Sequence, residues 1–246
     1  MIQQSIIKVM IGSFLLLFPS MLHAQRQTVA EQWLTEDHSG NMKIKVSGDT
    51  LDITSPKGVT MWYKERLTGE YEISYQVKVI MQGGKYDRLS DLNCFWGAND
   101  PQHPGKLFTR SQWRNGIFSN YKTLKLFYVG YGGNHNSTTR FRQYFGGDTD
   151  MDDSSVRPII KEYTDKQHLL VPNQWYHIRI QVTKDETAFF VNGETLFQLP
   201  LKDKEGDGHF GLRLLSNHVL FTGFQVNSMP NNTPDTKLKV LSTKLK

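Results

Sequence analysis

Residues 70–79 read EYEISYQVKV, and this stretch decides the fold class of the chain. Apolar or aromatic residues alternate strictly with polar ones over its whole length, a period of two that is typical of a half-buried β-strand. Residues 175–182 repeat the alternation. Asn192-Gly193 separates two further apolar runs. Because both residue types tolerate positive φ, the pair predicts a type I′ β-hairpin.

Outward from these segments, short apolar or alternating runs predict more strands. They lie at residues 42–46, 50–54, 58–63, 90–97, 124–131, 138–145, 208–215 and 218–227. About twelve short strands separated by Gly, Asn and Asp turns predict an all-β, two-sheet sandwich. Helical turns are expected only near residues 29–34. No Pro/Ser-rich linker interrupts the strands, so residues 25–228 are expected to form a single domain.

Two long polar segments interrupt the strands, at residues 98–123 and 146–173. Loops of this length inside a compact domain are usually functional or disordered. The C-terminal residues 229–246 contain two prolines and then alternating Lys and Leu. We expect them to form a flexible tail.

The N-terminus has the features of a signal peptide. Lys8 precedes the apolar residues 9–18, and a small residue, Ala24, stands at the expected cleavage position. The apolar run is too short to span a membrane, which takes about 20 residues. We therefore expect residues 1–24 to be removed and the mature chain to be periplasmic or secreted, without a membrane span. The alternative is an uncleaved N-terminal anchor.

Composition narrows the class of partner. The 246 residues carry a formal net charge of +5, and 12% of them are aromatic. Lys and Arg are spread along the chain instead of forming the patch or stripe of a nucleic-acid-binding protein, so no nucleic-acid partner is expected. A single cysteine, Cys94, excludes an internal disulfide framework and a cysteine-based zinc cluster.

The strand from residue 138 carries the main candidate site. Side chains alternate along a strand, so Arg140, Arg142 and Tyr144 are expected on one face and Phe141 and Phe145 on the other, towards the core. The planar fork of arginine suits carboxylates, and the paired charge is expected to lower the pKa of Tyr144 and make it a usable base. The alternative is a solvated face whose arginines pair with nearby acids. Those acids are Asp148, Asp150 and Asp152.

Two further polar residues are candidates for catalysis. His135 lies in a Gly-rich turn, and imidazole titrates near neutral pH, so it can transfer protons; the alternative is a merely exposed side chain. Asn93 is expected to share a strand face with Asp91, while Leu92 and Cys94 face the core.

Residues 148–153, DTDMDD, resemble a calcium loop but lack the Gly and Glu that an EF-hand needs at positions six and twelve. No cofactor is therefore expected, and a looser Ca²⁺ site at Asp148, Asp150 and Asp152 is the alternative to an acidic surface turn. The E-x-D-x-x-E signature of retaining glucanases, the G-x-S-x-G nucleophile elbow and the P-loop are all absent from the sequence.

Several segments together carry a family resemblance. They are residues 58–63, 69–73, 88–96, 128–134, 138–142, 173–178, 211–213 and 217–218. The chain resembles concanavalin A-like jelly-roll proteins of the lectin/glucanase type. Within these it is similar to exported Bacteroidetes proteins of unknown function from polysaccharide-utilisation gene clusters, such as those for rhamnogalacturonan.

The resemblance implies a jelly roll whose concave sheet forms a glycan groove. Jelly-roll polysaccharide lyases generally use Arg, Asn or Gln, His and Tyr on that sheet. The matching set here is Arg140, Arg142, Asn93, His135 and Tyr144. The candidate substrate-binding residues are Tyr128, Tyr131, Asn136, Trp113, Arg213 and His218.

These residues favour a lyase that cleaves a uronate-containing polysaccharide by β-elimination, with the arginines and Asn93 on the carboxylate and Tyr144 or His135 moving protons. A non-catalytic glycan-binding jelly roll, a glycoside hydrolase and a structural envelope protein are the alternatives.

Overall fold

The structure of the protein, a computed structural model, describes residues 29–202 and 204–229. The expected signal peptide at residues 1–24 and the tail from residue 230 lie outside the described residues. No helix in the described part of the chain is long and apolar enough to cross a membrane.

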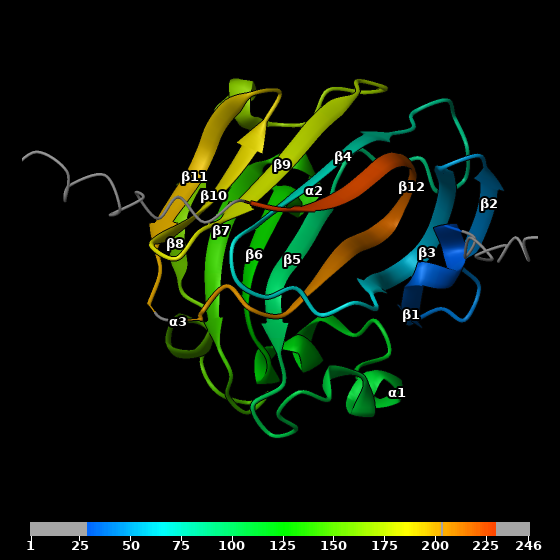
Figure 1. The fold of residues 1–246 in the computed structure, drawn as a ribbon. Coiled ribbons are helices and arrows are strands. Elements are labelled where there is room, and N and C mark those ends of the chain that lie inside the picture. The colour runs from blue at the N-terminus through cyan, green and yellow to red at the C-terminus, as the bar shows by residue number, and fades with distance from the viewer. Residues whose placement is uncertain (1–28, 203, 230–246) are drawn as a thin grey trace, which may run out of the picture.

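Twelve antiparallel strands form two packed layers (Figure 1). The β6 sheet contains β1 (Trp33–Asp37), β3 (Thr50–Tyr63), β12 (His209–Ser228), β5 (Leu92–Asn99), β6 (Lys125–Gly132), β7 (Thr138–Phe145) and β8 (Ile159–Tyr163), in that order. The β9 sheet contains β2 (Lys43–Ser47), β3, β12, β4 (Tyr71–Val79), β9 (Tyr176–Val182), β10 (Glu186–Val191) and β11 (Glu194–Pro200).

The long strands β3 and β12 belong to both layers. Residues 211–213 of β12 lie between β3 and β5, whereas residues 219–228 pair with β4. The register of β12 against β3 shifts between Leu215 and Asn217, and Ser216 there has a φ of 49°. This irregularity bends the ladder, because an extra residue in one strand disrupts the pairing and increases its twist.

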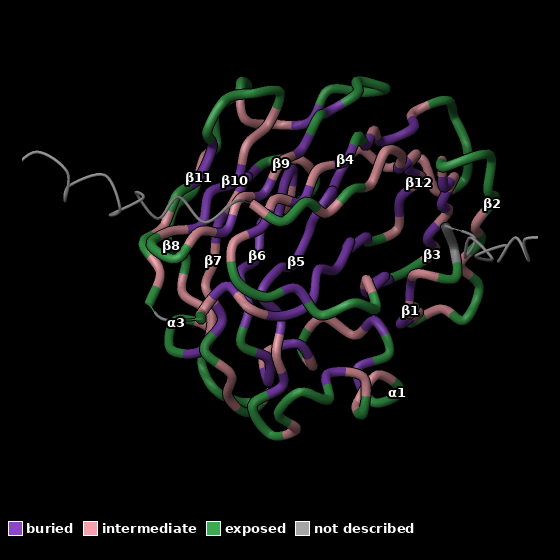
Figure 2. Tube along the Cα trace, viewed as in Figure 1, coloured by how far each residue is buried: buried purple, intermediate pink, exposed green. Residues whose placement is uncertain are grey.

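The main core fills the space between the layers. The alternating residues of 70–79 and 175–182 are buried on one face, as the sequence predicts. They are Tyr71, Ile73, Tyr75, Val77, Val79, Tyr176, Ile178, Ile180 and Val182. Figure 2 shows the buried positions following the strands and the exposed ones gathered at the turns. Trp96 of β5 is fully buried and stacks on Phe141 of β7 at 5.7 Å between ring centroids.

Residues 98–123, expected as a loop, form a second core on the outer face of the β6 sheet. Three short helices run through it: η2 (Leu107–Arg110), α1 (Ser111–Arg114) and η3 (Phe118–Thr123). Apolar residues of this segment pack against outward-facing side chains of the sheet. The cluster comprises Trp62, Phe95, Ala98, Leu107, Tyr121, Leu124, Leu126, Tyr128 and Tyr144.

A buried ion pair holds this segment to β1. The guanidinium of Arg114 donates to Glu36 Oε1 at 2.8 and 3.0 Å, and the Tyr121 hydroxyl donates to Glu36 Oε2 at 2.5 Å. Gly116 then crosses β1 and β3 so closely that a Cβ there would lie 2.3 Å from the Gly58 carbonyl oxygen.

The remaining elements are η1 (Val29–Gln32), α2 (Gly133–Asn136), α3 (Asp153–Val156) and η4 (Lys166–His168). Asn192 and Gly193 both have positive φ, 53° and 91°, which confirms the predicted hairpin turn. The strand β8 lies in the second expected loop. The helical turn predicted near residues 29–34 is present as η1, and β1, which was not predicted, begins directly after it at Trp33. Phe145 was expected in the core and is 44% exposed, because it ends β7 at the rim of the sheet.

Candidate functional site

A row of polar side chains crosses the outer face of the β6 sheet. Directly paired residues of antiparallel strands lie on the same face, and the register aligns one residue from each of the seven strands. The row is Glu36, Thr60, Arg213, Asn93, Gly130, Arg140 and Glu162. The second core covers the residues of the sheet on one side of this row. Beyond the edge of the second core, the row itself is left uncovered.

Two adjoining pockets lie along the open row, and we call them together the groove. The Arg213 pocket, of about 250 Å³, is also lined by His38, Gly58, Asn93, Gly116 and Ile117. The Arg142 pocket, of about 210 Å³, is also lined by Gly130, Asn134, Thr138, Arg140 and Arg157. Both share the lining residues Asp91, Phe118, Tyr128 and Leu215.

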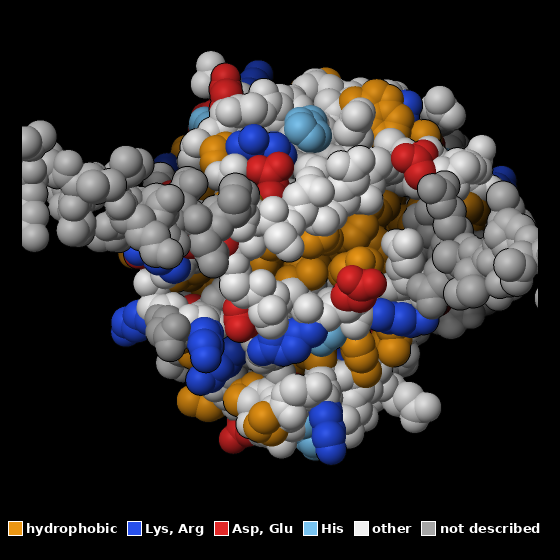
Figure 3. All heavy atoms as spheres, in the orientation of Figure 1, with side chains coloured by type: hydrophobic (Ala, Val, Ile, Leu, Met, Phe, Trp, Pro, Cys, Tyr) orange, Lys and Arg blue, Asp and Glu red, His pale blue; other side chains and the backbone are white. Residues whose placement is uncertain are grey.

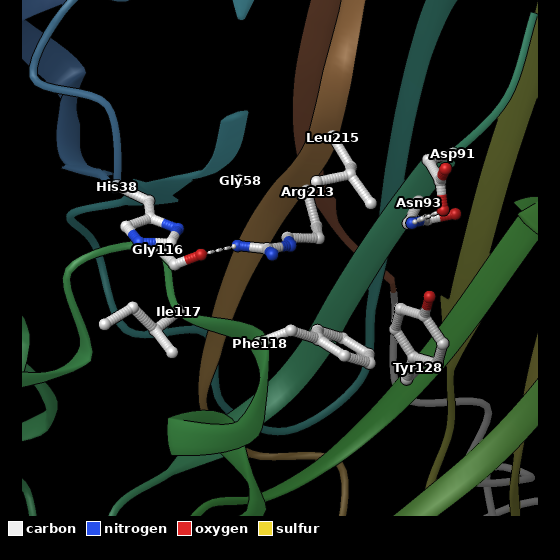
Figure 4. Close-up of a pocket in the computed structure, with 10 residues that line it drawn as sticks. All are labelled: His38, Gly58, Asp91, Asn93, Gly116, Ile117, Phe118, Tyr128, Arg213 and Leu215. Carbon is white, nitrogen blue, oxygen red and sulfur yellow. Dashed lines mark hydrogen bonds between the residues drawn. The ribbon is translucent and has the colours of Figure 1, made fainter. Parts of the chain in front are cut away.

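Arg213 is the most enclosed cation of the groove, at 2% exposure (Figure 4). Its Nη1 donates to the Gly116 carbonyl oxygen at 2.8 Å and to Thr60 Oγ1 at 3.2 Å. The guanidinium lies 5.3 Å from the ring centroids of both Phe118 and Tyr121. Cation–π attraction and hydrogen bonds to neutral acceptors therefore hold the side chain in place. None of these contacts supplies a negative charge.

Asp91 and Asn93 face the groove together, as the sequence predicts. Asn93 Nδ2 donates to Asp91 Oδ1 at 3.3 Å, and Asp91 Oδ2 accepts from Arg88 at 2.5 Å. Asn93 is 3% exposed, and its Oδ1 is buried without a hydrogen-bond partner. A buried polar atom left unsatisfied is costly, so this oxygen is suited to accept from a ligand.

The Arg142 pocket gathers three arginines. Arg142 donates to the main-chain oxygen of Arg157 at 2.5 Å, and Arg157 pairs with Asp153 at 2.7 Å. Arg140 pairs with Glu162 of β8, and not with the acids of residues 148–153 as one alternative proposed. The Arg157 guanidinium also lies 4.9 Å from the centroid of Phe118, so this ring stands between the arginines of the two pockets.

The charge of the groove is therefore positive. Among the described residues, Arg140, Arg142, Arg157 and Arg213 line it; Arg140 is paired with Glu162, Arg157 is paired with Asp153, and the lining carboxylate Asp91 is paired with Arg88. Within residues 29–202 and 204–229, neither Arg213 nor Arg142 has a carboxylate within 4.0 Å. The face drawn in Figure 3 instead carries both acidic and basic side chains around a central apolar patch.

The tyrosines differ from the sequence prediction. Tyr144 is 1% exposed and lies in the second core, behind Arg157. Burial raises the pKa of its phenol, although Arg157 and Arg142 act in the opposite direction, so the predicted lowering is wrong. Tyr128 does line both pockets, and burial raises its pKa well above the usual value too.

The turn between β6 and β7 does not direct His135 into the groove. Asn134, His135 and Asn136 have positive φ, His135 is exposed, and of these three residues Asn134 alone lines the groove. Asn136 instead accepts from the Leu170 N–H at 2.8 Å and donates to its carbonyl oxygen at 2.9 Å. It thereby ties the second long segment to this turn.

The other predicted binding residues lie elsewhere. Tyr131 lies three residues after Tyr128 on β6 and therefore faces the opposite side of the sheet. It is part of the main core, where its ring contacts that of Tyr176. Trp113 is 43% exposed and carries Arg110 over its ring at 3.9 Å. His218 lies between Asp52 and Asp87, at 2.8 and 3.1 Å.

Asp148, Asp150 and Asp152 are exposed. In the described part of the chain no three His, Cys, Asp or Glu side chains gather in a way that would hold a metal ion.

Sequence reasoning missed Phe118, Arg157, Gly116 and His38 as groove residues. All four lie outside the predicted strands, in segments without periodicity, so no pattern indicates which face they approach. The one signal is the length of the two polar segments, which is typical of functional or disordered loops.

Comparisons with known proteins identify a family for this chain and solved structures with a similar fold. A family model described as "Domain of unknown function (DUF6250)" matches residues 53–224. No curated protein sequence matches the chain.

Among solved structures, a Bacillus subtilis protein of unknown function with a galectin-like fold superposes with a TM-score of 0.62 at 15% identity, covering 81% of this chain and 90% of its own. The carbohydrate binding module CBM66 from Bacillus subtilis gives 0.51 at 12% identity, covering 80% and 96%. A legume lectin-like domain from Entamoeba histolytica gives 0.50 at 11% identity, covering 82% and 92%. These similarities confirm the predicted jelly-roll sandwich.

Proposed function

The chain belongs to the DUF6250 family, and from this premise we propose that it is a glycan-binding jelly-roll protein whose groove takes an acidic glycan without cleaving it. The observation that carries the proposal is the charge of the groove, where two of the four arginines, Arg142 and Arg213, have no carboxylate within 4.0 Å among the described residues and the lining carboxylate Asp91 is already paired with Arg88. Arginine forks bind carboxylates and sulfates through paired, charge-assisted hydrogen bonds.

The aromatic lining supports a sugar ligand. Phe118 and Tyr128 border both pockets, and an aromatic ring presents an apolar face on which the C–H face of a sugar ring can pack. The solved structures with the same fold include a carbohydrate binding module and a lectin-like domain, which is consistent with a sugar-binding role for this sheet.

The geometry supports binding better than β-elimination. A lyase needs a group that removes a proton from the bound sugar and one that protonates the leaving oxygen. His135 is exposed outside the groove, Tyr144 is buried behind it, and burial raises the pKa of Tyr144 and Tyr128. Glycoside hydrolysis normally uses two carboxyl groups, and among the described residues that line the groove Asp91 is the only one with a carboxyl group.

The expected route of export belongs to the same proposal. We propose that residues 1–24 are removed and that the mature protein meets its glycan outside the cytoplasm. The support is the charged, apolar and small-residue order of this segment. Mass spectrometry of the protein from its native host tests it, and an intact Met1 contradicts it.

Calorimetric titration against a panel of polysaccharides tests the binding function. We expect binding of uronate-containing or sulfated chains, weaker binding of neutral chains, and weaker binding at high salt because exposed charges are screened. Ultraviolet absorbance in the same samples reports unsaturated products. A rise in that absorbance would replace the proposal by the lyase, and equal affinity for neutral and acidic chains would contradict the role of the arginines.

A further inference from the structure

We propose that the Arg213 pocket recognises the carboxylate of a uronic acid unit together with a free hydroxyl next to that carboxylate, the first on Arg213 and the second on Asn93. The inference rests on the proposed function and deepens it, because it assigns one chemical group of the ligand to each of two neighbouring residues. Arg213 and Asn93 are direct partners on adjacent strands, so their side chains leave the same face.

The first argument is the unbalanced charge of Arg213. A buried ion normally has an opposite charge beside it, because desolvation costs several kcal/mol per ion. The acids nearest in the row and pocket already have partners: Glu36 is bound by Arg114 and Tyr121, and Asp91 is bound by Arg88. An anionic ligand would therefore supply the charge that the described residues do not.

The second argument is the shape of the unused donors. Nη1 of Arg213 is occupied by Gly116 and Thr60, whereas Nε and Nη2 have no hydrogen-bond partner among the described residues. These two N–H groups form one edge of the planar guanidinium and donate in parallel. A carboxylate, whose two oxygens lie in one plane, matches that edge with two hydrogen bonds.

The third argument is the acceptor beside it. Asn93 Oδ1 is buried and unpartnered, while Nδ2 of the same amide is held by Asp91. Because that hydrogen bond orients the amide, the oxygen is left to accept from a ligand. In a uronic acid the carboxylate is attached to ring carbon C5, and the hydroxyl on the neighbouring ring carbon C4, which is free at the non-reducing end of a 1,4-linked chain, is a donor of the right kind.

The fourth argument is the space around the arginine, shown in Figure 4. Gly58 lies against the fork, and a Cβ at that position would be 2.6 Å from Nη2 and 2.4 Å from the Gly116 carbonyl oxygen. Phe118 and Tyr128 form the opposite wall. The glycine therefore keeps the donor edge clear, and the aromatic residues provide a surface for the sugar ring.

The first experiment varies the ligand and leaves the protein intact. Oligogalacturonate, its methyl ester and its carboxyl-reduced neutral form are titrated calorimetrically, with alginate and glucuronate oligomers as further acids and a sulfated neutral oligosaccharide as a control anion. We expect at least about tenfold weaker binding of the ester and of the reduced form than of the best acid. The sulfated control should also bind more weakly than that acid.

The second experiment varies the protein. Arg213→Lys keeps the charge and removes the fork, and Asn93→Ser shortens the acceptor; Arg142→Ala is the matched control in the other pocket. Arg213→Lys should reduce the difference between acid and ester, because it keeps the charge and loses the paired hydrogen bonds, whereas Arg142→Ala should weaken both ligands and preserve the difference. Circular dichroism reports folding of each variant, and the ligand series decides the question if Arg213→Lys does not fold.

Three outcomes would each overturn the assignment and leave glycan binding intact. The acid and the ester could bind with equal affinity, or the sulfated control could bind best. The affinity difference between acid and ester could also be lost in Arg142→Ala and kept in Arg213→Lys. The absence of binding to every oligosaccharide would instead overturn the proposed function itself.

Discussion

The two faces of the β6 sheet are buried to a similar degree and yet differ in chemistry. On β5, Cys94 and Trp96 face inwards at 1% and 0% exposure, while Asn93 faces outwards at 3%. On β12, Leu212 faces inwards at 1% and Arg213 outwards at 2%. The inner face packs against a second sheet, whereas the outer face is covered in part by residues 98–123 and left open in part as the groove.

The comparison shows that burial does not by itself define a core. Apolar packing on the inner face stabilises the fold by removing surface from water. The polar residues of the outer face are desolvated at a cost, which only hydrogen bonds or opposite charges offset. Where an opposite charge lies beside the buried ion, as for Arg114 and Glu36, the outer face is structural. Where no described carboxylate lies beside the buried cation, as for Arg213, and a neighbouring acceptor such as Asn93 Oδ1 has no partner, it is suited to a ligand.

The largest expected effect on stability comes from a substitution in the core on the inner face. Trp96→Ala removes a fully buried ring that stacks on Phe141 and donates to Thr187 at 2.9 Å. We expect a loss of about 3–5 kcal/mol in the free energy of unfolding, measured by urea denaturation. Trp113→Ala, at 43% exposure, is the control and should cost no more than about 1 kcal/mol. Similar losses in the two variants would contradict the assignment of the core.

The next largest effect on stability comes from substitutions of the buried ion pair on the outer face. Arg114→Met leaves Glu36 buried without its cation and should cost about 3 kcal/mol in the free energy of unfolding. Adding Glu36→Gln removes the uncompensated charge, so the double variant should regain part of that loss in the same denaturation assay. A double variant that is less stable than Arg114→Met would show that the pair matters through packing instead of charge.

A smaller effect separates the two arginines of β7. Arg142→Ala should weaken binding of an acidic oligosaccharide about tenfold, as for a lost hydrogen bond to a charged group. Arg140→Ala should weaken it less, because Glu162 already engages Arg140. Both variants should unfold within about 0.5 kcal/mol of the parent, since neither side chain is part of a core. Calorimetry measures the affinities, and an equal loss in both variants would contradict this ranking.

The smallest effect concerns pH at the rim of the groove. Arg157, followed by Lys122, lowers the pKa of Asp153 to about 2 from its usual 3.8. A carboxyl group whose pKa is lowered by folding stabilises the folded state above its unfolded pKa, and this contribution is lost as the pH falls from about 4 to about 2. Because the side chain is 44% exposed, solvent screening should keep the contribution below about 1 kcal/mol.

Asp153→Asn should therefore flatten the dependence of the urea midpoint on pH in that window, and near neutrality it should lower the midpoint slightly without changing its dependence on pH. Asp150→Asn is the matched control, because Asp150 is exposed and has no ion pair within the described residues. An unchanged slope in Asp153→Asn would show that other carboxyl groups govern the acid transition.

Much of the fold was predictable because strand alternation is a local property. Residues 70–79 and 175–182 reveal their buried faces through a period of two, and Asn192-Gly193 reveals its turn through positive φ. The strand at Trp33–Asp37 was not predictable, because its inward and outward pattern includes the buried carboxylate of Glu36. A polar residue at such a position looks solvent-exposed until its partner, Arg114, is known.

The candidate site, like the fold, was predictable only in part from the sequence. Sequence alone determined that Arg140 and Arg142 leave one strand face and that Asn93 and Asp91 leave another, because side-chain direction follows from the backbone of a single strand. Which of these residues lie together depends on strand register and on segments far away in sequence. The register sets Arg213 beside Asn93, the long segments bring Phe118 and Arg157 to them, and the second core buries Tyr144. Charge balance and desolvation act through space, so they are settled only when the chain has folded.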